Sequence, residues 1–214
     1  MMHPKTELRF ISAEIGHGVV ATQDIPKGTI TWVQDELDRE FTPEFVAALG
    51  EPYGGQLDTY CFRNHLGHWI LCWDHARFVN HSFKSNCMTT AYNFEVAIRD
   101  IKAGEELTDD YGYLNIIEPF RAMDEGCDRT VVYPDDLVRY HPVWDRKLRS
   151  VWPAIPSVNQ PLRGLLDRGL WQRACRIARG EEPMASILEC YFDQSELAVR
   201  ASVRSVDRTR SPGR

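Results

Sequence analysis

The first half of the chain alternates short β-favouring segments with turns that contain glycine or proline, and this alternation limits the fold most strongly. Residues 8–11 and 18–22 are rich in branched and aromatic side chains, and Gly16 lies between them. Further segments of this kind cover residues 29–33, 60–64, 69–73, 88–99 and 105–108. Many short strands joined by tight turns predict a mainly β core of small sheets.

One short helix is predicted inside this β-rich half. Thr42 is a good N-cap residue, Pro43 suits the first helical position and Glu44 makes the first turn acidic. Gly50 then marks the point at which the helix ends. Residues 60–64 and 69–73 flank Leu66-Gly67 and resemble a hairpin.

The second half of the chain has a different pattern. Residues 135–150 and 161–180 are helix-like, with leucines in the second segment at helical spacing, and a proline-containing linker joins them. Residues 195–214 are polar and arginine-rich without an apolar period, so we expect a disordered tail there. The fold class predicted is therefore mainly β with α additions.

Composition excludes some classes of function. The 214 residues fit one domain with an appendage, and the net charge of -6 argues against a protein that coats nucleic acid. The chain has no apolar run that could span a bilayer and no signal peptide at its start, so we expect a cytoplasmic protein without membrane contact. The six cysteines are dispersed without a C-x-x-C pair, which predicts reduced thiols.

Three separated segments carry residues suited to ligand chemistry. Gly16-His17-Gly18 lets backbone approach a ligand closely, although it lacks the third glycine and following helix of the dinucleotide fingerprint. Asn80-His81-Ser82 offers hydrogen-bond donors and acceptors for a polar ligand. The run 104–113 ends in Tyr111-Gly112-Tyr113, which would present two phenols at the end of a strand. Taken alone, the first segment is better explained as a plain turn and the second as a buried, hydrogen-bonded polar pair. The third is as well explained by a turn and a strand with two aromatic core residues.

Taken in this order and spacing, the three segments resemble the diagnostic motifs of the SET-domain family of protein-lysine methyltransferases. The resemblance covers about residues 8–120. It implies a core of small curved sheets around a pseudoknot, in which the second and third motifs thread past each other. We therefore expect a SET domain at 6–120, a helical extension at 121–194 and the tail at 195–214.

The resemblance also implies an activity and a set of site residues. Such a protein transfers a methyl group from S-adenosylmethionine to a lysine in a protein or peptide partner. By the motifs, the backbone of Gly16, His17 and Gly18 would hold the methionine part of the cofactor. Asn80 and His81 would bind its amino group and adenine, and Tyr111 matches the catalytic tyrosine.

The channel for the lysine is implied less directly. Tyr60 and Tyr113 are candidates for its wall, and Tyr111 would orient the amine, because a phenol is a poor base near neutrality. Asp109 stands where many members of the family have an aromatic ring. Its carboxylate could bind the substrate amine or a water in the channel, or turn outward and cap a loop.

The chain departs from many SET domains in lacking the cysteines of a zinc-binding segment after the tyrosine motif. Phe83 occupies the position of one such cysteine, and the sequence after Phe120 contains no cluster of them. We therefore expect no structural zinc, with Phe120, Tyr133 or the C-terminal helices covering the cofactor instead.

A second possible metal set also fails. Cys61, His65, His68 and Cys72 would lie along the two strands of a hairpin, with Cys61 and His65 roughly 13 Å apart along one strand at about 3.3 Å per residue. One zinc ion with ligands at about 2.0–2.3 Å cannot reach both.

Two alternatives to lysine methylation remain open on sequence. A SET module can bind the cofactor or a peptide as a non-catalytic scaffold, which the absent zinc segment and Asp109 keep possible. A methyltransferase acting on a small amine is the other, because the segment around residues 42–60 is short.

Overall fold

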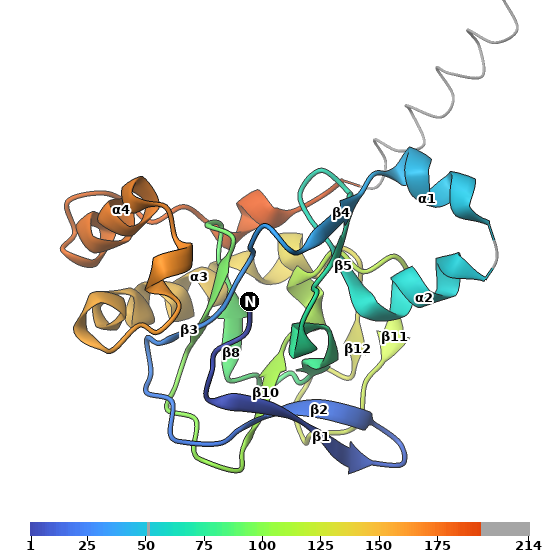
Figure 1. Ribbon diagram of the computed structural model, residues 1–214, viewed down its shortest axis with the longest axis horizontal. Coiled ribbons are helices and arrows are strands. Elements are labelled where there is room, and N and C mark those ends of the chain that lie inside the picture. The colour runs from blue at the N-terminus through green and yellow to red at the C-terminus, as the bar shows by residue number, and fades with distance from the viewer. Residues whose placement is uncertain (51, 194–214) are drawn as a thin grey trace, which may run out of the picture.

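The computed structural model describes residues 1–50 and 52–193. Small sheets make up the first half of the chain, and helices follow in the second half (Figure 1). This arrangement confirms the predicted class, mainly β with α additions. The tail predicted at 195–214 lies outside the described residues.

The largest sheet has four strands in the order β1-β2-β10-β7. β1 (Thr6–Ser12) and β2 (Gly16–Ala21) form the antiparallel hairpin expected around Gly16. β10 (Glu106–Asp109) pairs with β2 on one side and, in parallel, with β7 (Asn80–His81) on the other. This pairing places all three sequence motifs in one sheet.

A second sheet has three strands in the order β3-β9-β8. Its strands are β3 (Ile30–Val33), β8 (Cys87–Thr89) and β9 (Phe94–Ala97), and the expected segment 88–99 is therefore a hairpin of two strands. All four residues of β3 are buried. Trp32 lies directly opposite Glu95 on the neighbouring strand.

The third sheet and two helices form a segment inserted between β3 and the second motif. The sheet contains β4 (Arg39–Phe41), β6 (Trp69–Leu71) and β5 (Cys61–Arg63) in that order. α1 (Pro43–Leu49) begins as predicted, because the Thr42 hydroxyl accepts a hydrogen bond from the backbone of Phe45. α2 (Tyr53–Tyr60) was not predicted, and it ends where a strand was expected to begin.

The hairpin of β5 and β6 is confirmed, but its register differs by one residue from the one expected. Cys61 faces Leu71 rather than Cys72. The loop is held by Asn64, whose side-chain oxygen accepts from the backbones of Leu66 and His68 at 3.0 Å each. Five residues therefore make the turn, where a two-residue turn was predicted.

The chain after the third motif starts with a small hairpin and continues in helices. β11 (Phe120–Arg121) pairs with β12 (Val131–Val132). α3 (Asp136–Val151) confirms the first predicted helix. The second predicted helix begins late, because α4 (Arg168–Ala178) starts where Asp167 caps the backbone of Gly169.

The proline-rich stretch between α3 and α4 is part of the core rather than a simple linker. It contains the 3-10 turns η3 (Trp152–Ser157) and η4 (Arg163–Leu165), and Trp152 and Ile155 are buried. A last turn, η5 (Ile187–Cys190), packs against α3. The helices α3 and α4 lie on the side of the molecule opposite α1 and α2 (Figure 1).

One hydrophobic cluster joins the two halves of the chain. It includes Met88 and Phe94 from the second sheet together with Trp144, Leu148 and Trp152 from the helical region. The regions expected at 6–120 and 121–194 therefore share a core. A second cluster lies between the two larger sheets and contains Val19, Trp32 and Leu107.

Candidate active site

A cavity of about 460 Å³ lies between the central strands and the inserted segment. Trp32, Glu95 and Asp109 line it from β3, β9 and β10. The end of α2 forms the opposite wall with Asp58, Thr59 and Tyr60, which are exposed. The cavity therefore opens to solvent on the side of α2, while its other end reaches the buried sheet.

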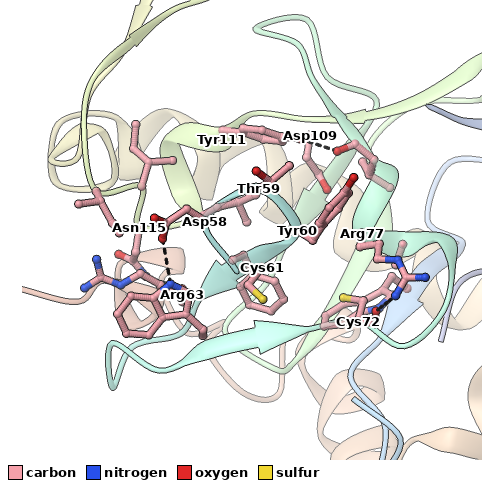
Figure 2. A pocket seen from close by; sticks show the side chains of 18 of the residues that line it. Asp58, Thr59, Tyr60, Cys61, Arg63, Cys72, Arg77, Asp109, Tyr111 and Asn115 are labelled. Atoms are coloured by element: carbon pink, nitrogen blue, oxygen red, sulfur yellow. Dashed lines mark hydrogen bonds between the residues drawn. The ribbon is translucent and has the colours of Figure 1, made fainter. Parts of the chain in front are cut away.

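Tyr111 lies at the buried end of this cavity (Figure 2). It starts the short turn η2 (Tyr111–Tyr113), which Asp110 caps by accepting from the backbone of Gly112 at 3.0 Å. Its hydroxyl donates to the carbonyl of Val79 at 2.7 Å. Burial raises the pKa of Tyr111, so its phenol stays protonated near neutral pH. The group can orient a ligand by hydrogen bonding but cannot act as a base.

Asp109 points into the same end of the cavity and is only 3% exposed. The Tyr113 hydroxyl donates to its carboxylate at 2.7 Å, and the Glu95 carboxyl shares a second hydrogen bond with it. Burial raises the pKa of Asp109 to about 6. Of the two orientations left open by the sequence, the structure therefore has the inward one.

The other two candidates for the channel wall are placed differently. Tyr60 lines the cavity at its rim, with its ring 5.6 Å from that of Phe78. Tyr113 is 1% exposed, packs against Trp144 and does not line the cavity. It contributes to the site through its hydrogen bond to Asp109.

The first two motifs meet beside β10, outside the cavity. The Asn80 amide donates to the carbonyl of His17 at 2.9 Å and to Glu106 at 2.7 Å. A Cβ added at Gly18 would lie 2.9 Å from that amide nitrogen and 2.2 Å from the Glu106 carboxylate. Gly18 is therefore required by this close approach of the strands, while Gly16 has a φ of +83° and open space around it.

His81 connects this region to Tyr111. Its Nδ1 accepts from the backbone N–H of Tyr111 at 3.1 Å, so the proton of the neutral ring is on Nε2. Nε2 is buried and has no hydrogen-bond partner among the residues that the structure describes, and burial lowers the pKa of the ring. A neutral ring with a free N–H donor is therefore available to a ligand.

Aromatic rings surround His81 on several sides. The rings of Phe83, Tyr111 and Phe120 lie 4.5, 5.4 and 5.5 Å from it. Phe120 also contacts Tyr111, at 6.1 Å between ring centroids. The structure thus brings Phe120, the predicted cofactor cover, together with His81 and Tyr111. Tyr133, the other single residue considered as a cover, is 39% exposed and packs against Arg139.

Arg129 was missed by the sequence analysis and occupies the place where a zinc-binding segment was considered. Its guanidinium forms ion pairs with Asp110 and Asp136, which are 2% and 1% exposed. It also lies over the rings of Phe83 and Tyr140, at 4.5 Å from each. This Arg129 cluster ties the chain after β11 to η2 and to the start of α3.

The second possible metal set is dispersed in the structure. His68 pairs with Glu40, and Cys61 and Cys72 are free thiols. Among residues 1–50 and 52–193, no group of three or more metal-binding side chains is close enough to hold an ion. Within the same ranges, no helix has the length and apolar character needed to cross a bilayer.

Glu95 is the other site residue that the sequence did not indicate. It lies in a strand between Phe94 and Val96, both of which are buried. A charged residue between two apolar residues of a strand usually faces solvent, so the sequence did not indicate that Glu95 lines a cavity. Only the tertiary structure reveals its contact with Asp109, which lies on a strand of another sheet.

One family model matches part of the chain. Residues 16–112 match the model of the SET domain, a range that contains the first two motifs and the third up to Gly112. The chain therefore contains a segment similar to the SET domain, which is less than half of its 214 residues. No curated protein matches it.

Several solved structures are similar to it. One is a Plasmodium falciparum protein described as a candidate histone methyltransferase, with 18% identity and a TM-score of 0.38 over 51% of this chain and 95% of that one. Another is a humanized mutant of the Chaetomium thermophilum Polycomb Repressive Complex 2 bound to the inhibitor GSK343, with 22% identity and a TM-score of 0.38. A third is apo ctPRC2 in an autoinhibited state, with 24% identity and a TM-score of 0.40. For each of these last two structures, the similar region covers 51% of this chain and 15% of the other chain.

Proposed function

We propose that this protein transfers a methyl group from S-adenosylmethionine to the side-chain amine of a lysine in a protein substrate. The SET-domain match supports the class of reaction. The single observation that carries the proposal is the position of Tyr111. It lines the cavity and at the same time donates its backbone N–H to His81. One residue thus connects a pocket for the substrate with the motifs expected to hold the cofactor.

The residues around His81 fit the proposed cofactor. The free Nε2–H of His81 can donate to a ring nitrogen, and the ring of Phe120 provides an apolar surface beside it. Gly16 leaves open space at the start of β2 for a polar head group. When bound, S-adenosylmethionine supplies a methyl carbon activated by a positively charged sulfur.

The cavity suits a long side chain that ends in an amine. Its outer part opens beside Tyr60, and its inner end holds Tyr111 and Asp109. The Tyr111 hydroxyl already donates to Val79, so its oxygen is left to accept a hydrogen bond from the amine. Alignment of the reacting atoms is the main contribution such a site can make to a displacement.

The test is transfer of tritiated methyl from S-adenosylmethionine to proteins of a cell lysate, followed by mass spectrometry of the labelled residue. Tyr111→Phe should lower the rate by about 100-fold, because the amine is no longer oriented. Tyr53→Phe is the matched control, since Tyr53 is 56% exposed and outside the cavity lining, and it should transfer normally.

Two outcomes would contradict the proposal in different ways. Binding of the cofactor without transfer to any lysate protein would favour a non-catalytic scaffold. Label found only in the low-mass fraction would favour a methyltransferase that acts on a small amine.

A further inference from the structure

Two carboxyl groups from strands of different sheets meet at the buried end of the cavity. Glu95 on β9 and Asp109 on β10 both line it, and their side chains share a hydrogen bond. A hydrogen bond between two carboxyl groups requires a proton on one of them. The pair therefore contains one donor and one acceptor.

The surroundings decide which group keeps the proton. Burial and the charge of Asp109 raise the pKa of Glu95 well above its usual range. Both carboxyls accept one further hydrogen bond, and the one from Tyr113 to Asp109, at 2.7 Å, is shorter than the one from Thr89 to Glu95, at 3.2 Å. At neutral pH Glu95 is therefore the protonated donor and Asp109 the anion. The titratable groups around the pair include the Met1 ammonium, which lowers the pKa of Glu95, and the neutral or anionic side chains of Cys72, Cys87, Asp110, Tyr111 and Tyr113. The cationic side chains of Arg63 and Arg77 also line the cavity.

An unpaired donor lies beside these carboxyls. Trp32 faces Glu95 directly across the strands, so both side chains are on the same side of the sheet and line the cavity. Trp32 is 5% exposed, and its buried indole N–H has no hydrogen-bond partner within residues 1–50 and 52–193. A buried donor of this kind is normally satisfied, which indicates that the end of the cavity receives a polar group.

We propose that Asp109, held in place by Glu95, takes the proton from the substrate ammonium in this cavity. The inference rests on the proposed function and names Asp109 as the base in the proposed methyl transfer. Asp109 would touch the amine and is the catalytic residue in this sense. Glu95 acts through Asp109 and is a positioning residue.

The step balances in atoms and charge. One N–H bond of the ammonium breaks, an O–H bond forms on Asp109, and the nitrogen keeps the electron pair. The pair then bonds to the methyl carbon, and the carbon–sulfur bond breaks with its electrons going to sulfur. Asp109 afterwards releases the proton to water, so one proton leaves per methyl transferred.

Two physical reasons favour Asp109 over other groups. A free lysine amine has a pKa of about 10.4, so it enters protonated and has no lone pair for attack. Tyr111 is itself protonated near neutrality and cannot accept that proton. Transfer to Asp109 converts an ammonium and a carboxylate into two neutral groups, which a buried site tolerates better than separated charges.

The pH profile of single-turnover methyl transfer tests this assignment. In the wild-type protein the rate should rise up to about pH 6, where Asp109 ionises, and then level off. In Asp109→Asn the rate of methyl transfer should be low at pH 7 and rise about tenfold per pH unit, because only amine that has lost its proton in solution can then react. Asp24→Asn, which removes an exposed carboxylate paired with Lys102, should keep the wild-type profile.

If Asp109→Asn does not fold, a second variant and a second measurement still test the assignment. Glu95→Met removes the hydrogen bond that lowers the pKa of Asp109, so the rising part of the profile should move to higher pH. In the cofactor-free protein, the infrared band of the protonated Asp109 carboxyl should disappear as the pH rises through about 6. Asp109→Asn should show no carboxyl band that titrates near this pH.

The results separate this inference from the proposed function. An unchanged profile in Asp109→Asn or in Glu95→Met, with normal transfer by the wild type, would overturn the base assignment alone. A carboxyl band that does not titrate in the cofactor-free wild type would also overturn it. A wild-type protein that transfers no methyl to any substrate would overturn both.

Discussion

At the scale of single residues, Gly18 shows how close the three motifs come to one another. The carboxylate of Glu106 and the amide of Asn80 occupy the space that a side chain at this position would need. The Asn80 amide also donates to the carbonyl of His17 on β2 and to Glu106 on β10, the strand that pairs with β2. A larger residue must therefore separate the strands that carry the three motifs.

Gly18→Ala is expected to destabilise the protein by about 1–3 kcal/mol, because its Cβ overpacks this contact. It should also weaken binding of S-adenosylmethionine, measured by titration calorimetry. Gly54→Ala is the matched control, since nothing lies within 4 Å of a Cβ there and alanine suits the helix α2. Equal cofactor affinity in the two variants would show that the approach of the strands does not shape the site.

At the scale of elements, the Arg129 cluster fixes the segment that follows β11. One guanidinium forms ion pairs with two buried carboxylates and is covered by aromatic rings from two other parts of the chain. Asp110, one of the two carboxylates, also caps the turn that carries Tyr111. The position of Tyr111 is therefore coupled to the helical half of the molecule.

Arg129→Met should lower the free energy of unfolding by about 3–5 kcal/mol, because it leaves Asp110 and Asp136 as uncompensated buried charges. Arg139→Met removes an exposed ion pair with Asp135 and should cost less than about 1 kcal/mol. Urea unfolding followed by circular dichroism measures both. Similar losses in the two variants would contradict a special role of Arg129.

At the scale of the whole molecule, the shared core predicts that the sheets and the helices unfold together. Trp152 packs against Tyr92 and Phe94 from the first half and donates its indole N–H to the carbonyl of Ala174 at 3.0 Å. The helical region thus completes the packing of the second sheet. It is a structural part of the domain rather than an appendage to it.

Trp152→Ala should destabilise the protein by about 3–5 kcal/mol, through the cavity left in the core. Near-ultraviolet and far-ultraviolet circular dichroism should report the same lowered midpoint for both halves. Leu165→Ala, at a residue that is 40% exposed, should change the midpoint little. Two separate transitions in Trp152→Ala would show that the halves fold independently.

Much of the local structure and of the site could be predicted from sequence, because its signals lie between near neighbours in the chain. The N-cap at Thr42 and the hairpin around Gly16 depend on interactions over a few residues. The late start of α4 was missed, because the helical spacing of apolar residues begins before Asp167, whereas the cap at Asp167 sets the start of the helix. The register of β5 and β6 was missed by one residue, because the side chain of Asn64 sets the turn.

The sequence by itself determined the three motifs, their resemblance to the SET domain and the candidate residues Tyr111 and His81, because residue type and order suffice to recognise them. Only the tertiary structure decided that Asp109 points inward onto Glu95, and that Arg129 joins Asp110 to Asp136. Both contacts connect residues from different elements. Their energies come from burial and from charges brought together by folding, and neither leaves a pattern in the linear chain.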